Sequence, residues 1–360
     1  MNALPGGRHI RAALTLGLSW LLAGSPVESA FAAEAQLDSS CVLRLAETAD
    51  GAMTLEELRQ RCAAAAGSLR DAPAENANQA EGAAEPAESS PGPVEERLAA
   101  ERAAAAQPFS ILAHKPNYFL VGAYNWEGWN PDPYREQFGN PSFENQDVEG
   151  QFQISLKVPL AVGLFGNRMD IYGAYTNRSF WQMYNSDFSE PFRETNHEPE
   201  IWAQFANDWK VLGMTNTVNT FGWVHQSNGR AGGLSRSWNR LFATFLFERG
   251  RWVFAVKPWV WVSSDKDNSD NPDIDDYMGH GEFRAVYGRE GHVFSAMLRN
   301  QLESGFERGA VELSWSFPVF DYPYLKGYVQ YFYGYGESLI DYDSKVNRLG
   351  IGISVTDWLD

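Results

Sequence analysis

Residues 151–160 read QFQISLKVPL, and every second residue of this stretch from Phe152 onward is apolar. Successive side chains of a β-strand point to opposite faces, so Phe152, Ile154 and Leu156 would share one face. Gln151 and Gln153 would share the other face with further polar residues. Residues 311–317 and 348–355 repeat this alternation. The pattern predicts a sheet with one apolar face and one polar face.

A soluble sandwich and a transmembrane barrel both alternate in this way. From about residue 107, segments of about ten residues repeat the alternation over roughly 250 residues, as in a membrane barrel. Many Trp and Tyr residues lie near segment ends, and aromatic residues make up 14% of the chain. A closed barrel is also the only sheet that pairs every backbone polar group inside lipid. We therefore expect an all-β fold, an antiparallel transmembrane β-barrel of about 12 strands.

The N-terminus resembles a secretory signal. Arg8 and Arg11 precede the apolar segment 12–24, and Ala30-Phe31-Ala32-Ala33 has the small residues of a cleavage site. An uncleaved anchor helix is the alternative, but the apolar segment is short for a membrane span. Residues 1–33 are therefore expected to be a signal peptide, and the mature protein to be exported by a Gram-negative cell.

Residues 34–106 differ in character from the rest of the chain. Cys41 and Cys62 bracket two short segments with helical patterns, and in an oxidising compartment they are expected to form a structural disulfide. Residues 63–106 are rich in Ala, Glu and Pro, which is typical of a flexible linker, with some helix near Val94–Ala106. The expected domains are a signal peptide (1–33), a small, partly disordered periplasmic segment (34–106) and the barrel (107–360).

The overall charge limits the possible partners. The formal net charge is −17 and the pI is about 4.8. Because nucleic-acid backbones are polyanionic, this charge argues against non-specific binding to nucleic acid.

Three polar residues of the stretch Val224–Arg240 fall on predicted apolar faces. His225 and Ser227 are two residues apart and share a face with aromatic residues. Asn239, on the next predicted strand, shares its face with Leu241, Ala243, Phe245 and Phe247. Polar groups on the lipid face of a barrel are costly, so they suggest a functional role. Singly, His225 could be a headgroup-level histidine and Ser227 a turn residue.

The residue types match nucleophilic catalysis. A serine hydroxyl is a weak nucleophile and needs a base such as His225 within hydrogen-bond reach. The imidazole in turn needs its tautomer and orientation fixed, which the side-chain oxygen of Asn239 can do. A neutral amide is a reasonable choice at the edge of lipid, where an unpaired carboxylate would be costly.

Five ordered motifs then resemble the outer-membrane phospholipase A family and span most of residues 107–360. They are PFRETN at 191–196, HQSNGR at 225–230, SRSWNR at 235–240, DNPD at 270–273 and GYGESLIDY at 334–342. The resemblance implies a barrel whose active site faces lipid near the outer-leaflet headgroups. It implies a phospholipase A1/A2 that hydrolyses acyl esters of phospholipids and lysophospholipids. Ser227 would be the nucleophile, His225 the base and Asn239 the orienting residue.

The resemblance also implies calcium dependence and activity as a homodimer. By motif position, the Arg230 backbone carbonyl and the Ser235 hydroxyl would hold Ca²⁺, with Ser189 contributed by the other subunit. Asp270 matches a further calcium-binding acid. It could instead be a solvated loop residue, because Asp265, Asp267, Asp273, Asp275 and Asp276 crowd the same loop.

Two positions depart from the family pattern. Asn177, on the expected outer face, stands where the family usually has a longer amide at the dimer contact, so it is either a dimer contact or a headgroup-level residue. His197 stands where an aromatic residue is common and could replace that ring without a catalytic part.

Two other functions remain open from the sequence. The first is a barrel without catalysis, a channel or adhesin, whose lumen would carry polar residues such as His280, Glu282 and Arg284. The second is a soluble periplasmic serine esterase.

Overall fold

The computed structural model describes residues 61, 91–188, 191–263, 269–300, 307–320 and 322–360. The chain divides into two compact units, residues 1–85 and 86–360, and every strand that the structure describes lies in the second unit. The predicted signal peptide, Cys41, Cys62 and Ser189 lie outside the described residues. The predicted domain limits therefore stay predictions.

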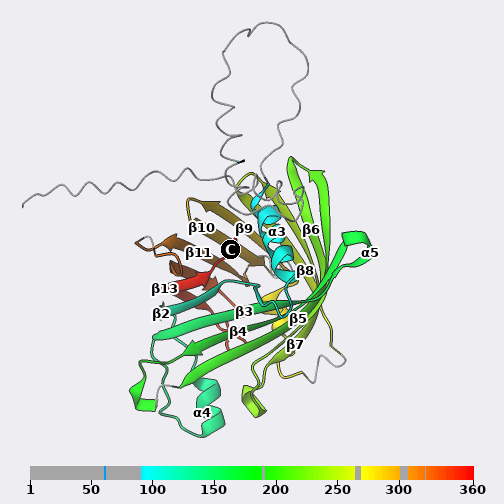
Figure 1. The fold of residues 1–360 in the computed structure, drawn as a ribbon. Helices are drawn as coiled ribbons and strands as arrows, with labels where there is room; N and C mark the ends of the chain where they lie inside the picture. The colour runs from blue at the N-terminus through cyan, green and yellow to red at the C-terminus, as the bar shows by residue number, and fades with distance from the viewer. Residues whose placement is uncertain (1–60, 62–90, 189–190, 264–268, 301–306, 321) are drawn as a thin grey trace, which may run out of the picture. The chain divides into compact units, whose positions relative to one another are not determined.

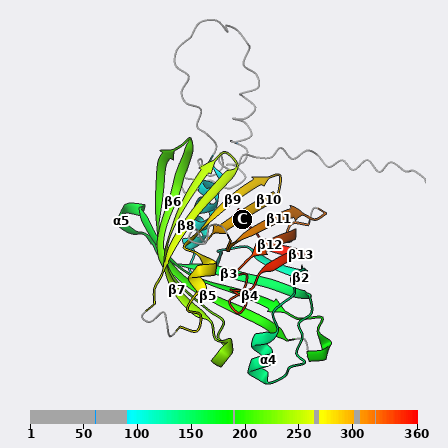
Figure 2. The same ribbon diagram turned by 180° about the vertical axis from the view of Figure 1, so that it is seen from behind.

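Twelve long antiparallel strands close into a barrel, as the alternating pattern predicts (Figures 1 and 2). Strand β2 pairs with both β13 and β3, and β3 pairs with β4, so the sheet has no open edge. A further strand of two residues, β1 (Leu112–Ala113), pairs with β3. The twelve strands are β2 (Asn117–Asn125), β3 (Val148–Gly163), β4 (Met169–Trp181), β5 (Phe192–Val211), β6 (Met214–Ser227), β7 (Ser237–Arg249), β8 (Trp252–Trp261), β9 (Gly281–Arg289), β10 (His292–Asn300), β11 (Gly309–Pro318), β12 (Lys326–Gly334) and β13 (Val346–Thr356).

The apolar residues of the alternating strands face outward. On β3, Ile154 and Leu156 are exposed while Gln151 and Ser155 are buried, and β13 shows the same division. In water this arrangement would expose a continuous apolar surface, but in a bilayer it places apolar side chains against lipid. The outer surface therefore excludes the soluble esterase considered above.

The two ends of the barrel differ in their connections. Leu212–Gly213 and Glu290–Gly291 form two-residue turns in which both residues have positive φ, the geometry that matches the strand twist. The other end carries longer connections, including residues 126–147, 228–236, 262–280 and 335–345. Outer-membrane barrels have short turns on the periplasmic side and long loops outside. The long connections therefore mark the extracellular end.

The helices are short. Those with bounds inside the described ranges are α3 (Pro93–Ala105), α4 (Asp132–Phe138), α5 (Leu164–Asn167) and α6 (Ile274–Met278), with 3₁₀ turns η1 (Ser186–Phe188) and η2 (Gly232–Leu234). In the described part of the chain, no helix is long and apolar enough to cross a membrane.

Helix α3 lies at the short-turn end of the lumen (Figure 1). Its first turn is fixed where the backbone N–H of Val94 donates to Glu248 Oε2 at 3.1 Å. Its last turns are fixed by an ion pair of 2.8 Å between Glu101 and Lys157. Val94 and Leu98 pack against inward-facing valines of the wall. The helix that the sequence indicates near residues 94–106 is thus part of the barrel interior.

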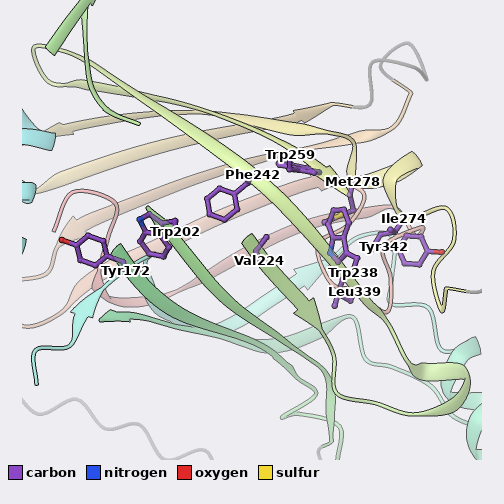
Figure 3. Packing of buried hydrophobic residues seen from close by; sticks show 10 residues of the cluster. All are labelled: Tyr172, Trp202, Val224, Trp238, Phe242, Trp259, Ile274, Met278, Leu339 and Tyr342. Carbon is purple, nitrogen blue, oxygen red and sulfur yellow. The ribbon is translucent and has the colours of Figure 1, made fainter. Parts of the chain in front are cut away.

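A row of large side chains fills the lumen between β4 and the long loops (Figure 3). Gly222 of β6 makes room for it, because a Cβ there would lie only 2.6 Å from Trp202 Cβ and 2.7 Å from Phe242 Cζ. Paired charges fill much of the remaining space, as in the ion pairs of Arg193 with Glu149 and of Arg348 with Glu337. The cluster in Figure 3 comprises Tyr172, Trp202, Val224, Trp238, Phe242, Trp259, Ile274, Met278, Leu339 and Tyr342.

Candidate active site

The three candidate catalytic residues lie on two neighbouring strands near the long-loop end. His225 and Ser227 end β6, and Asn239 lies near the start of β7. In the β6–β7 register, His225 faces Asn239 and Ser227 faces Ser237. Val224, directly before His225, and Trp238, directly before Asn239, are buried in the lumen, so the three polar side chains lie on the outward face. Their outward neighbours on the same strands include exposed apolar residues such as Phe221 and Leu241.

The His225 ring is oriented by the amide of Asn239. His225 Nδ1 lies 2.9 Å from Asn239 Oδ1. An amide oxygen can only accept, so this contact places the proton on Nδ1 and leaves Nε2 as the acceptor. Trp223 stacks on the same ring with a centroid distance of 6.3 Å. The geometry thus gives His225 the tautomer that a general base requires.

Ser227 shares the outer face with His225 at the last position of β6. Among the described residues, its hydroxyl makes no hydrogen bond to the His225 ring, in contrast to the close contact with Asn239. In enzymes without bound substrate, the nucleophile and the base often lie farther apart than in the complex with substrate. The structure therefore brings the candidate base and its candidate orienting residue into contact and places the candidate nucleophile beside them.

The predicted calcium ligands lie just beyond the strand ends. The Ser235 hydroxyl donates to Asp270 Oδ2, which brings together two loops that are 35 residues apart in the sequence. The Arg230 side chain is engaged elsewhere, because it forms an ion pair of 3.3 Å with the buried Glu194. Its backbone carbonyl is the atom that the family resemblance proposes as a ligand.

The donors available here fit calcium. Hydroxyl, carboxylate and backbone carbonyl oxygens are the ligands that Ca²⁺ prefers, and its flexible geometry suits a site shared between loops. Within the described ranges, no three His, Cys, Asp or Glu residues gather into a metal site. The candidate set of Arg230, Ser235 and Asp270 contains only one acidic side chain, so further oxygens would have to complete it.

Two residues that sequence reasoning missed shape this region. Asn228 directly follows the candidate nucleophile, but its side chain is buried and bonds to the loop behind it. Asn271 is also buried, and its Oδ1 accepts from the backbone N–H of Ser237 at 2.9 Å. Gly229, directly after Asn228, has φ of 64°, a conformation that favours glycine. Both asparagines lie within the quoted motifs, but only the fold shows their contacts.

The two departures from the family pattern both lie on the outer face beside Ser227. His197 faces Ser227 on one side and Asn177 on the other in the strand register. His197 Nδ1 lies 2.6 Å from the Tyr175 hydroxyl. The Asn177 side-chain oxygen accepts from Ser179 Oγ at 3.0 Å. A polar patch therefore extends from the candidate active site across three strands.

The polar residues expected in the lumen are found there, with one exception. Arg284 is buried and lies 3.4 Å from Glu312, and Glu282 is half-buried beside it on β9. His280 is exposed and precedes β9. Together with α3 and the cluster of large side chains in Figure 3, these charged residues occupy space that a wide channel would leave to water.

Sequence comparisons with known proteins point to a single family. A family model described as phospholipase A1 matches residues 94–355. A phospholipase A1 from Escherichia coli K12 is 41% identical over 262 residues, covering 69% of this chain and 83% of the relative. One from Klebsiella pneumoniae is 37% identical over 251 residues, covering 69% of this chain and 84% of the relative.

Solved structures agree as well. The outer membrane phospholipase A of Escherichia coli superposes with a TM-score of 0.63 at 35% identity, covering 69% of this chain and all of that one. An outer membrane phospholipase dimer of Salmonella typhi with bound calcium gives the same score and identity, covering 71% of this chain and 96% of that one. The chain described here therefore belongs to the phospholipase A1 family of outer-membrane β-barrel enzymes.

Proposed function

We propose that this protein is a calcium-dependent phospholipase A, active as a homodimer, that hydrolyses acyl esters of phospholipids and lysophospholipids. The observation that carries the proposal is the 2.9 Å contact between His225 and Asn239 on the lipid-facing wall, on the same face as Ser227. A site on this face can receive a lipid from the bilayer without moving its acyl chains into water.

The reaction begins with attack of Ser227 Oγ on the ester carbonyl carbon, while His225 Nε2 takes the hydroxyl proton. Asn239 keeps the proton on Nδ1 and stabilises the imidazolium that forms. Backbone N–H groups following Ser227 are suited to hold the oxyanion of the tetrahedral intermediate. When bound, calcium would add positive charge near that oxyanion.

The intermediate then collapses. The bond between the carbonyl carbon and the glycerol oxygen breaks, and His225 returns its proton to the departing alcohol, which is a lysophospholipid when the substrate is a diacyl phospholipid. Water, deprotonated by His225, attacks the acyl-enzyme and releases the fatty acid and the free Ser227. Atoms and protons balance over the cycle, so the chain's own groups are sufficient for the proton transfers.

Calcium and the dimer enter the proposal from the Salmonella typhi relative, whose structure is a dimer with bound calcium. On this chain the ligands would be the Arg230 carbonyl, the Ser235 hydroxyl and Asp270, with Ser189 of the partner subunit. The contact of Ser235 with Asp270 supports this set because it places two of the oxygens side by side.

The test is a phospholipid hydrolysis assay on the purified chain in mixed micelles, with calcium added or chelated. Fatty-acid release should require calcium and should fall when extra detergent dilutes the dimers. The matched variant Asp270→Asn should raise the calcium concentration needed, whereas Asp276→Asn in the same loop should not. Hydrolysis that is equally fast in chelator would contradict the proposal.

A further inference from the structure

The loop after the candidate nucleophile is held from inside the barrel by one amide. Asn228 is only 5% exposed and points into the lumen, although Ser227 before it points outward. Its Oδ1 accepts from the backbone N–H of Arg230 at 3.2 Å and of Arg236 at 3.0 Å. Its Nδ2 donates to the Leu234 carbonyl at 2.7 Å and to Glu194 at 3.4 Å. These four bonds use the whole capacity of an asparagine side chain.

The bonds of Asn228 join the two halves of the loop 228–236. Arg230 and Ser235, the proposed calcium ligands, lie on opposite halves, and the amide contacts backbone groups next to both. The backbone N–H of Asn228 also donates to the Arg236 carbonyl at 3.1 Å. The spacing of the two ligands is thus set by a group that points away from them.

Glu194 of β5 supports this amide from the lumen. Its side chain is fully buried, and it accepts from Asn196 Nδ2 at 2.8 Å as well as from Asn228. It also pairs with Arg230 Nε at 3.3 Å. The Arg230 guanidinium donates further to the Arg193 carbonyl at 2.8 Å. One carboxylate therefore connects the neighbouring strand to both Asn228 and Arg230.

We propose that Asn228, supported by Glu194, is a positioning residue that preorganises the loop 228–236 for calcium. This inference rests on the proposed function, since it assigns a role toward the proposed calcium site. Neither side chain reaches the lipid face, so neither contacts the substrate. A loop that already has its calcium-binding conformation loses less conformational freedom when the ion binds, and this raises the affinity for calcium.

The test uses calcium binding instead of turnover as its main measurement. Calcium titration calorimetry is performed on the Ser227→Ala chain, with and without Asn228→Asp. The aspartate side chain has the shape of the amide but lacks its two N–H donors. Its carboxylate oxygens therefore face two other acceptors, the Glu194 carboxylate and the Leu234 carbonyl. Changes in residues that support metal ligands typically cost 10- to 100-fold in affinity, so we expect calcium binding about tenfold weaker or more.

Asn216→Asp is the matched control. Asn216 is a buried amide on β6, the strand that ends directly before Asn228, and it donates to the Leu246 carbonyl at 2.9 Å near the opposite end of that strand. This variant should bind calcium within about twofold of its parent, because it changes no contact of the loop that carries the proposed calcium ligands. An equal loss in both variants, or no loss with Asn228→Asp, would overturn the inference.

The double variant Asn228→Asp with Glu194→Gln keeps the proposal testable if the single variant folds poorly. The glutamine amide can donate to the new carboxylate, which restores a hydrogen bond with its direction reversed. We expect the double variant to bind calcium more tightly than Asn228→Asp alone, and a merely additive loss would contradict the assigned partnership. A parent chain that binds no calcium would instead overturn the proposed function and, with it, this inference.

Discussion

The inner and outer faces of the barrel wall carry polar residues in different ways. Inside, Arg193 is fully buried and bonds to both Glu149 and Asp341, so each charge has a partner. Outside, near Ser227, the polar residues are few, neutral or titratable, and surrounded by exposed apolar side chains. The inner set stabilises the fold, whereas the outer set adds chemical groups where packing alone would favour apolar ones. A change inside should therefore affect stability first, and a change outside should affect activity first.

The largest effect is expected from Ser227→Ala. Removing the proposed nucleophile should lower kcat by about 10⁴-fold or more. The free energy of unfolding should change by no more than about 0.5 kcal/mol, because no buried hydrogen bond is lost. Fatty-acid release and denaturant unfolding in detergent measure the two effects.

Ser237→Ala is the control for this substitution. Ser237 faces Ser227 in the strand register and lies on the same outward face. It should keep nearly full activity. A similar loss in both variants would mean that the polar patch as a whole matters, and not one nucleophile.

The largest effect on stability is expected inside the barrel, from Arg193→Met. The substitution keeps much of the volume but leaves Glu149 and Asp341 without their shared cation. Breaking a buried ion pair by removing one partner typically costs about 3–5 kcal/mol. Denaturant unfolding of the purified barrel should show this loss.

Arg289→Met is the exposed counterpart, because Arg289 pairs with Glu290 at a turn where both side chains are mostly exposed. Surface pairs are worth about 0–1 kcal/mol, so this variant should unfold almost like its parent. Equal losses at the two positions would remove the contrast between the paired charges inside the barrel and those exposed to solvent.

A smaller effect on activity is expected from Asn239→Ala. The lost hydrogen bond to His225 leaves the ring free to rotate and to change tautomer. A hydrogen bond to a group that becomes charged is worth about 1.5–3 kcal/mol, so kcat should fall by about 10- to 100-fold. Asn239→Asp keeps the acceptor and should retain more activity. If Asn239→Ala hydrolyses phospholipid at the parent rate, His225 is oriented by something else.

The smallest effect is expected at the proposed dimer contact, from Asn177→Ala. The Asn177 oxygen already accepts from Ser179 within its own chain, which leaves less of the amide for a partner. Polar contacts between membrane segments average about 0.6 kcal/mol, so the dimer dissociation constant should rise only about threefold. Sedimentation equilibrium in detergent with calcium would measure it. A rise of a hundredfold would show that this short amide is a principal dimer contact.

The sequence predicts the barrel because its strands repeat one simple pattern. Residues 151–160 already show which face is apolar, and a strict period of two leaves little freedom in register. The outward position of His225, Ser227 and Asn239 follows from the same period. Their catalytic roles come from the family resemblance and residue chemistry, and they stay predictions.

The supporting contacts could not be predicted in this way. Asn228 and Glu194 are 34 residues apart, and Ser235 and Asp270 are 35 apart. No local sequence pattern predicts either contact, because the closure of the barrel decides which loops meet. The alternating pattern also does not predict the position of α3. The ion pair between Glu101 and Lys157 holds this helix against the inner wall.

The most direct test of the central claim is covalent labelling with a long-chain alkylsulfonyl fluoride, followed by mapping of the modified peptide by mass spectrometry. The account predicts one adduct, on Ser227, which forms in lipid micelles and is greatly slowed by His225→Ala. An adduct on another serine, or labelling of Ser227 that does not depend on His225, would contradict a lipid-facing nucleophile activated by its neighbouring histidine.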